Sequence, residues 1–131
     1  MTEDTAKSRK ILIVDDDASI RLLVRSSLRK MKNVEFFEAD NGAAGFLLVE
    51  KISPDLIFLD VVMPVMNGID FLVKLREIKE RNTIPVILLT GYKDKQRLEE
   101  VLELPNTTLI TKPFIVEDLV KKAGILLNES V

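Results

Sequence analysis

Carboxylates that follow short apolar runs are the residues of this chain best placed to do chemistry. The segment Asp15–Asp17 comes directly after Ile11–Val14, and Asp60 comes directly after Leu56–Leu59. Ionised groups at the ends of buried strands repel one another and lose hydration, so packing alone does not explain them. Two carboxylates about 4 Å apart repel by roughly 4 kcal/mol at an effective dielectric of 20. A bound cation would remove that cost, and the pattern therefore predicts a cation site.

The composition narrows the chemistry further. The chain has 131 residues with no cysteine and no histidine, so thiolate nucleophiles, imidazole bases and disulfides are excluded. The remaining oxygen ligands suit a hard cation such as Mg²⁺. An ionised Asp60 can attack phosphorus to form an acyl phosphate. Lys112 can supply positive charge to the phosphoryl oxygens, while the Thr90 hydroxyl and the Gly91 amide can supply hydrogen bonds.

Length and charge indicate one soluble domain. A hydrophobic content of 47% is enough to fill one core, and we expect the domain over residues 10–128, with a disordered lead-in at 1–9 and a tail at 129–131. The 19 basic and 21 acidic residues form no long block of like charge, so we expect no direct binding of nucleic acid. The chain has no apolar stretch of membrane-spanning length and no secretory signal pattern, which favours a cytoplasmic protein without membrane insertion.

The order of elements predicts an α/β fold. Five short apolar runs alternate with segments of helical periodicity, and such a (βα)5 alternation predicts a doubly wound parallel sheet with helices on both faces. Ligands bind such sheets outside the carboxyl ends of the strands. We expect Asp15, Asp16, Asp60, Thr90 and Lys112 at that edge. The predicted strands are Lys10–Val14, Val34–Glu38, Asp55–Leu59, Pro85–Thr90 and Thr107–Thr111.

Five apolar helical faces accompany these strands. Asp17 is assigned to capping the first helix rather than to a metal, and Pro54 ends the second helix. We interpret Asn41-Gly42 and Asn67-Gly68 as turns. The apolar positions of the five faces are Ile20, Leu23, Val24, Ser27, Leu28 and Met31; Phe46, Leu47 and Ile52; Leu72, Leu75 and Ile78; Leu98, Val101 and Leu102; and Val116, Leu119, Val120, Ala123 and Leu127.

Four motifs stand at the ends of four predicted strands. They are Val14-Asp15-Asp16-Asp17, Leu59-Asp60-Val61-Val62-Met63-Pro64 followed by Asn67-Gly68, Leu89-Thr90-Gly91, and Thr111-Lys112-Pro113-Phe114. In order and position these motifs resemble the response-regulator receiver domains of two-component signalling. The resemblance covers about residues 9–128, and it implies a flavodoxin-like five-stranded sheet in the order 2-1-3-4-5. It also implies a cis peptide bond before Pro113, a position where a cis bond costs little.

The resemblance assigns roles by position. It implies that Asp60 accepts a phosphoryl group from a sensor histidine kinase or a histidine phosphotransfer protein. It implies that Mg²⁺ is bound directly by Asp16, Asp60 and the main-chain carbonyl of Val62, with Asp15 acting mainly through water. Phosphorylation would then switch the surface built by the fourth helix, the fifth strand and the fifth helix, and this surface would bind a downstream protein that the sequence does not identify.

Residues around the predicted acceptor have implied roles as well. Lys112 would pair with Asp60 and then with the phosphoryl oxygens, and Thr90 would move toward the phosphoryl group on activation. Many relatives couple that movement to a Tyr or Phe three residues before the lysine, where this chain has Leu109. The aromatic ring of that switch is therefore missing here.

Two further positions would flank the phosphoryl group. Val62 stands two residues after the predicted acceptor, where many relatives carry a polar side chain, and Tyr92 stands two residues after Thr90. Together with Gly91 they would border the incoming group. We predict that the apolar Val62 beside the bulky Tyr92 restricts water and lengthens the life of the aspartyl phosphate.

Other functions fit the sequence less well. Phosphohydrolases resembling haloacid dehalogenases also use an Asp after an apolar strand, but they require a second Asp at the position where this chain has Val62. A receiver-like interaction module that needs no phosphorylation would retain the fold and lose the chemistry, whereas here all the motif residues are present. Nucleotide binding lacks a glycine-rich loop after the first strand. Because no output domain follows Val131, we expect a stand-alone switch that passes its signal to another protein.

Overall fold

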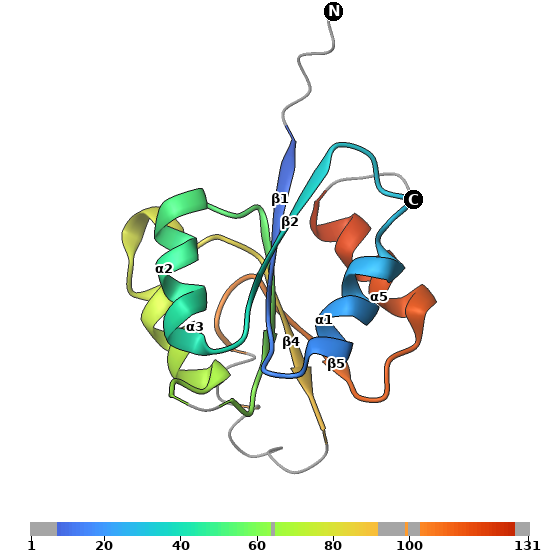
Figure 1. The fold of residues 1–131 in the computed structure, drawn as a ribbon. Helices are drawn as coiled ribbons and strands as arrows, with labels where there is room; N and C mark the ends of the chain where they lie inside the picture. The colour runs from blue at the N-terminus through green and yellow to red at the C-terminus, as the bar shows by residue number, and fades with distance from the viewer. Residues whose placement is uncertain (1–7, 64, 92–98, 100–102, 128–131) are drawn as a thin grey trace, which may run out of the picture.

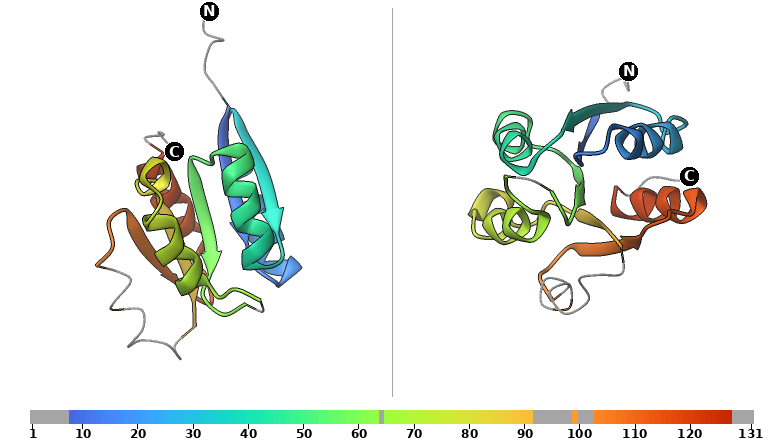
Figure 2. Two further views of the ribbon diagram at one scale, coloured as in Figure 1. Left: turned by 90° about the vertical axis from the view of Figure 1, so that its left-hand side faces the viewer. Right: turned by 60° about the horizontal axis from the view of Figure 1, so that its bottom comes forward.

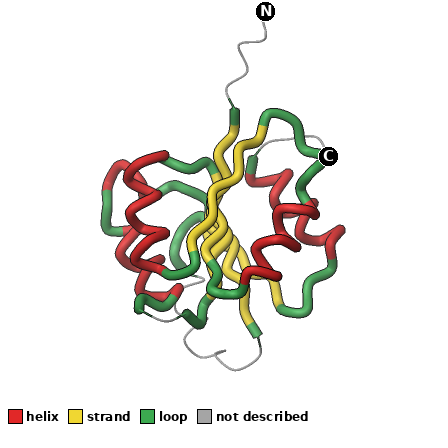
Figure 3. The backbone as a smooth tube through the Cα atoms, viewed as in Figure 1, coloured by secondary structure: helices red, strands yellow, loops and turns green. Residues whose placement is uncertain are grey.

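The chain forms one parallel sheet between two layers of helices (Figure 1, Figure 3). The structure is a computed structural model that describes residues 8–63, 65–91, 99 and 103–127. The strands are β1 (Arg9–Val14), β2 (Val34–Ala39), β3 (Leu56–Asp60), β4 (Val86–Thr90) and β5 (Thr107–Thr111). The described helices are α1 (Ala18–Ser27), α2 (Gly42–Ile52), α3 (Gly68–Arg76), the short 3₁₀ helix η2 (Lys79–Arg81) and α5 (Val116–Leu126).

The predicted fold class and strand order are confirmed. The sheet runs β2-β1-β3-β4-β5 with parallel pairing throughout, and each strand end lies within one residue of its predicted position. Helices α2 and α3 cover one face, and α1 and α5 cover the other (Figure 1, Figure 2). The fourth predicted helical face, with Leu98, Val101 and Leu102, lies outside the described residues.

Two hydrophobic clusters fill the space on either side of the sheet. Side chains alternate along each strand, so Leu12 and Leu59 join the cluster under α2 and α3, while Ile13 and Phe58 join the one under α1 and α5. Every residue of β3 is buried. Burial on both faces explains why this strand reads as a continuous apolar run, and it holds the carboxyl end of the strand rigidly.

Three of the predicted helical faces include positions that the structure places at the surface. Leu47 is 70% exposed, Val116 is 44% exposed and Leu23 is 37% exposed. Leu47 follows the buried Phe46 by one position, which is a rotation of about 100° around a helix. The predicted faces therefore included apolar residues that lie beside the buried positions of the helix and are not covered by the sheet.

The predicted cap of α1 is confirmed, and two residues predicted only as turns are also helix caps. Asp17 caps α1 by accepting a hydrogen bond from the Ser19 amide at 2.9 Å. Asn41 and Asn67 act as N-caps of α2 and α3 rather than as simple turns, since their side-chain oxygens accept from the amides three residues on, at 2.8 and 2.9 Å. These caps satisfy amides that the first helical turn leaves unpaired.

Candidate functional site

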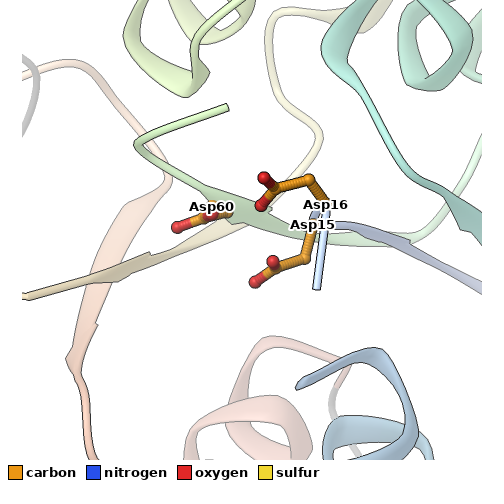
Figure 4. A group of neighbouring side chains, drawn as sticks. All are labelled: Asp15, Asp16 and Asp60. Atoms are coloured by element: carbon orange, nitrogen blue, oxygen red, sulfur yellow. The ribbon is translucent and has the colours of Figure 1, made fainter. Parts of the chain in front are cut away.

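The carboxyl edge of the sheet brings together residues from four strands. Asp15 follows β1, Asp60 ends β3, Thr90 ends β4, and Lys112 follows β5. Figure 4 shows the carboxylates of Asp15 and Asp16 beside that of Asp60, and one oxygen of each lies within 4.8 Å of the others. The edge therefore holds the three carboxylates that the sequence grouped together.

Asp15 carries a buried charge that the protein satisfies only in part. The residue is fully buried, and its Oδ1 accepts a hydrogen bond from the Asp17 amide at 2.9 Å. Its Oδ2 has no hydrogen-bond partner among the described residues. Burial, helped by the neighbouring Asp60 and Asp16, raises the pKa of Asp15 to about 6, while the Asp17 amide and the Lys112 ammonium act in the opposite direction.

Lys112 supplies the positive charge of the site. Its Nζ donates to Oδ1 of Asp60 at 3.1 Å and lies 3.5 Å from Oδ2 of Asp15. Burial alone would lower the pKa of Lys112, but the hydrogen bond to Asp60 and the two nearby carboxylates raise it. The ammonium thus stays charged, and it contacts two of the three acids.

Asp60 lies in a mostly buried position at the centre of the group. It is 5% exposed, and burial raises its pKa while the Lys112 ammonium and the Val62 amide act in the opposite direction. A Cβ atom on Gly68 would lie 2.2 Å from the main-chain oxygen of Asp60, and the Gly68 amide donates to the Val61 carbonyl at 2.8 Å. The start of α3 therefore packs directly on the backbone that carries Asp60.

At the β4 end of the site, Thr90 and Gly91 interact with each other. The buried Thr90 donates its hydroxyl to the carbonyl of Gly91 at 3.0 Å. A Cβ atom on Gly91 would meet no described atom within 4 Å, so the described surroundings do not require a glycine there. Tyr92 lies outside the described residues.

The loops that follow β3 and β5 carry exposed apolar side chains, of which the sequence analysis singled out only Val62. Val62 is 66% exposed, Val65 is 83% exposed and Ile115 is 69% exposed. Val65 also has a φ of 72°, which a β-branched residue rarely adopts. The Lys112-Pro113 bond is cis, as the resemblance implied.

The loop after β1, which contains Asp15, is supported by a contact that the sequence analysis did not predict. The guanidinium of Arg21, in the first turn of α1, donates from Nη1 to the main-chain carbonyl of Asp15 at 2.7 Å. Only the position of Arg21 in the sequence could have pointed to this contact: it stands four residues after the cap Asp17, and so on the side of the helix that faces the loop. Nothing in the residue pattern indicated the carbonyl as its partner.

The family model for the response regulator receiver domain matches residues 11–124. The chain belongs to this family. It is 38% identical over 112 residues to sporulation initiation phosphotransferase F of Bacillus subtilis, covering 86% of this chain and 88% of that protein. It is 33% identical over 116 residues to chemotaxis protein CheY-3 of Vibrio cholerae, covering 88% and 89%.

Some relatives are longer, and this chain spans only about half of their length. For transcriptional regulatory protein ResD of Bacillus subtilis, identity is 33% over 127 residues, covering 97% of this chain but 51% of the relative. Among solved structures, chemotaxis response regulator CheY4 of Vibrio cholerae matches with a TM-score of 0.81 and 30% identity, covering 92% of this chain and 100% of that one. A putative response regulator from Chloroflexus aurantiacus gives 0.83 and 27%, covering 94% and 100%.

These likenesses establish the general activity. The protein is a phosphoacceptor receiver domain of the response-regulator type, and neither the phosphohydrolase nor the phosphorylation-independent module is favoured. In the described part of the chain, no helix has the length and apolar character to cross a bilayer.

Proposed function

We propose that Asp60 is the phosphoacceptor and that its phosphorylation requires Mg²⁺. The observation that carries this proposal is the cluster of three carboxylates, two of which contact Lys112, with Oδ2 of Asp15 buried and lacking a hydrogen-bond partner among the described residues. Such an all-oxygen set fits Mg²⁺, which takes one or two carboxylates and keeps several waters. The direct ligands would be Asp16, Asp60 and the Val62 carbonyl, with Asp15 acting through water.

The side chains of the site have distinct tasks in the transfer. Asp60 attacks phosphorus with a carboxylate oxygen, the bond from phosphorus to the donor imidazole breaks, and the imidazole takes up a proton and leaves. When bound, Mg²⁺ supplies positive charge to the phosphoryl oxygens and to the acids that hold it. Lys112, already 3.1 Å from Asp60, shifts its ammonium to a phosphoryl oxygen. Thr90 exchanges its bond with the Gly91 carbonyl for one with the new group, and the Gly91 amide adds a donor.

The partners follow from the chemistry of the donor. A phosphohistidine is the natural source of the phosphoryl group for a family that works in two-component signalling, so we propose a cytoplasmic sensor histidine kinase or histidine phosphotransfer protein. The output would be a change of the surface around β5 and α5, read by a further protein. Leu109 is half-buried against the cluster under α2 and α3, so this change would proceed without an aromatic ring at that position.

Incubation with Mg²⁺ and a small phosphodonor, followed by intact mass measurement, tests the proposal. We expect one added phosphoryl group on the wild type and none on Asp60→Asn. Asp70→Asn, which removes a carboxylate from the first turn of α3, is the matched control and should be labelled like the wild type. Equal labelling of Asp60→Asn, or labelling that survives removal of Mg²⁺ by chelation, would contradict the proposal.

A further inference from the structure

Arg21 links the acidic loop to the edge strand of the sheet. Its Nη1 donates to the main-chain carbonyl of Asp15 at 2.7 Å, and its Nε donates to Oε1 of Glu38, on β2, at 2.9 Å. The side chain is only 18% exposed. One guanidinium therefore spans from α1 to the loop after β1 and to the neighbouring strand.

The Asp15 carbonyl, which accepts from Arg21, lies just beyond the last strand pairing of β1. The amide of Asp15 still donates to the Ala39 carbonyl at 3.1 Å, as a continuation of the pairing between β1 and β2. Beyond that point the chain turns toward α1, and the Asp15 carbonyl accepts from Arg21 instead of from a strand. The next residue is the exposed Asp16, whose carboxylate belongs to the acidic group. The direction of this carbonyl thus helps to set where that carboxylate lies.

Glu38 holds the other end of the link. It accepts from Arg21 at 2.9 Å and from Nη1 of Arg25 at 3.1 Å. Arg25 is more exposed, at 54%, and its guanidinium also lies over the Phe36 ring. The two arginines therefore share an acid and a helix, but of the two only Arg21 is hydrogen-bonded to the acidic loop in the described structure.

We propose that Arg21 is a positioning residue for divalent-cation binding, acting through the Asp15 carbonyl. The inference rests on the proposed function, because it concerns the same acidic group. The planar guanidinium is suited to two directed hydrogen bonds, which a lysine ammonium cannot reproduce at the same two acceptors. Residues that orient ligands in this way typically alter metal affinity by about 10-fold to 100-fold when they are changed.

The direction in which Mg²⁺ affinity changes when Arg21 is replaced distinguishes a positioning role from a purely electrostatic one. A guanidinium near a cation site repels the cation, so an Arg21 that acted through charge alone would weaken binding, and its removal would tighten it. An Arg21 that acts through position has the opposite effect on removal. Replacement by glutamine removes the charge and the link to Glu38 together, whereas replacement by lysine keeps the charge and loses the second bond.

The test is a titration of the ¹⁵N-labelled full chain with MgCl₂, followed by amide chemical shifts. We expect Arg21→Gln to weaken Mg²⁺ binding by about tenfold and Arg21→Lys to weaken it less. Arg25→Gln, which leaves the Asp15 carbonyl contact in place, is the matched control and should bind as the wild type does. At saturating Mg²⁺ the Arg21 variants should accept a phosphoryl group from a small phosphodonor at close to the wild-type rate, since the occupied site is then restored.

Each outcome has one meaning. Tighter or unchanged Mg²⁺ binding by both Arg21 variants would overturn the positioning role while leaving the proposed function intact. A wild type that binds no Mg²⁺ would overturn the proposed function itself, and this inference with it. If Arg21→Gln does not fold, Arg21→Lys and Glu38→Gln carry the test, and affinity equal to the wild type in both would reject the proposal.

Discussion

Among the described acidic residues, Asp15 is the one whose negative charge the metal-free fold disfavours most. Its pKa rises from an ordinary 3.8 to about 6, chiefly through burial, so folding favours the protonated acid. The stability linked to this group is present in full below pH 3.8 and is lost as the pH rises through about 6. Without Mg²⁺, Asp15→Asn should therefore raise the free energy of unfolding by about 1 to 3 kcal/mol at pH 8.

The pH dependence of the stability difference between Asp15→Asn and the wild type provides a control for this prediction. The gain of Asp15→Asn over the wild type should shrink between pH 8 and pH 5, as the wild-type acid takes up its proton. Urea unfolding followed by circular dichroism in the presence of a chelator measures both values. A variant no more stable than the wild type at pH 8 would show that the lost contact with Lys112 outweighs the relief of the buried charge.

Val65 is strained by its backbone conformation. Its φ of 72° lies in the left-handed region, which costs a β-branched residue of the order of 1–2 kcal/mol. Asparagine tolerates this region, so Val65→Asn should raise the free energy of unfolding by about 1 kcal/mol in urea titrations. Val73→Asn, a matched change at an exposed helical position in α3, should give no gain. Equal effects of the two substitutions would argue against backbone strain at Val65.

Val62 is the residue through which we expect the lifetime of the phosphoryl group to be set. Its exposed apolar side chain follows Asp60 by two positions, where it can hinder the approach of water to phosphorus. Val62→Asn should speed dephosphorylation several-fold, as followed by intact mass after removal of the phosphodonor. Val65→Asn, in the same loop, should change the rate less. A slower or unchanged rate in Val62→Asn would contradict the prediction.

At the scale of elements, α5 begins without the side-chain cap that the other described α-helices have. Its N-cap is Ile115, with the extended backbone of a cap but no side-chain hydrogen bond in the described structure. Ile115→Asp should stabilise the protein by about 1 kcal/mol, because the carboxylate can accept from the first amides and interacts favourably with the helix dipole. Thermal unfolding measures the effect.

The reciprocal substitution checks the interpretation of that prediction. Asn41→Ala removes the cap of α2, whose side-chain oxygen accepts from Ala44 at 2.8 Å, and it should cost a similar amount. If Ile115→Asp proved destabilising while Asn41→Ala behaved as expected, the exposed isoleucine would be held in the folded protein by contacts other than capping.

The strands were predictable from sequence because each is short, apolar and bounded by turn residues. The continuous apolar character of Leu56–Leu59 reflects burial on both faces of β3, and Asp60 stands out because it ends that run. Helical faces were predicted less well. Leu47 is apolar but exposed, and a hydrophobic pattern does not distinguish it from the buried Phe46 one residue earlier.

The acidic group was predictable from sequence, but its contacts were not. Parallel strands bring their carboxyl ends to one edge, so the meeting of Asp15 and Asp60 follows from the order of elements alone. The bond from Arg21 to the Asp15 carbonyl and the bond from Thr90 to the Gly91 carbonyl depend on loop and rotamer geometry. Residue types and spacing carry no information on either.

At the scale of the whole molecule, the site exists only when the sheet is complete. Its side chains come from β1, β3, β4 and the end of β5, and each strand is positioned by pairing with its neighbours. The apolar clusters on the two faces hold those strands in register. Asp60 therefore ends a strand whose side chains pack against both helical layers.

Chemical trapping identifies the residue that accepts the phosphoryl group. Borohydride reduces an aspartyl phosphate to homoserine, and peptide mass spectrometry then locates the converted residue. After treatment with Mg²⁺ and a small phosphodonor, we expect homoserine at position 60 alone, and none when a chelator is present. Homoserine at position 15, 16 or 17, or conversion at position 60 that does not need Mg²⁺, would contradict it.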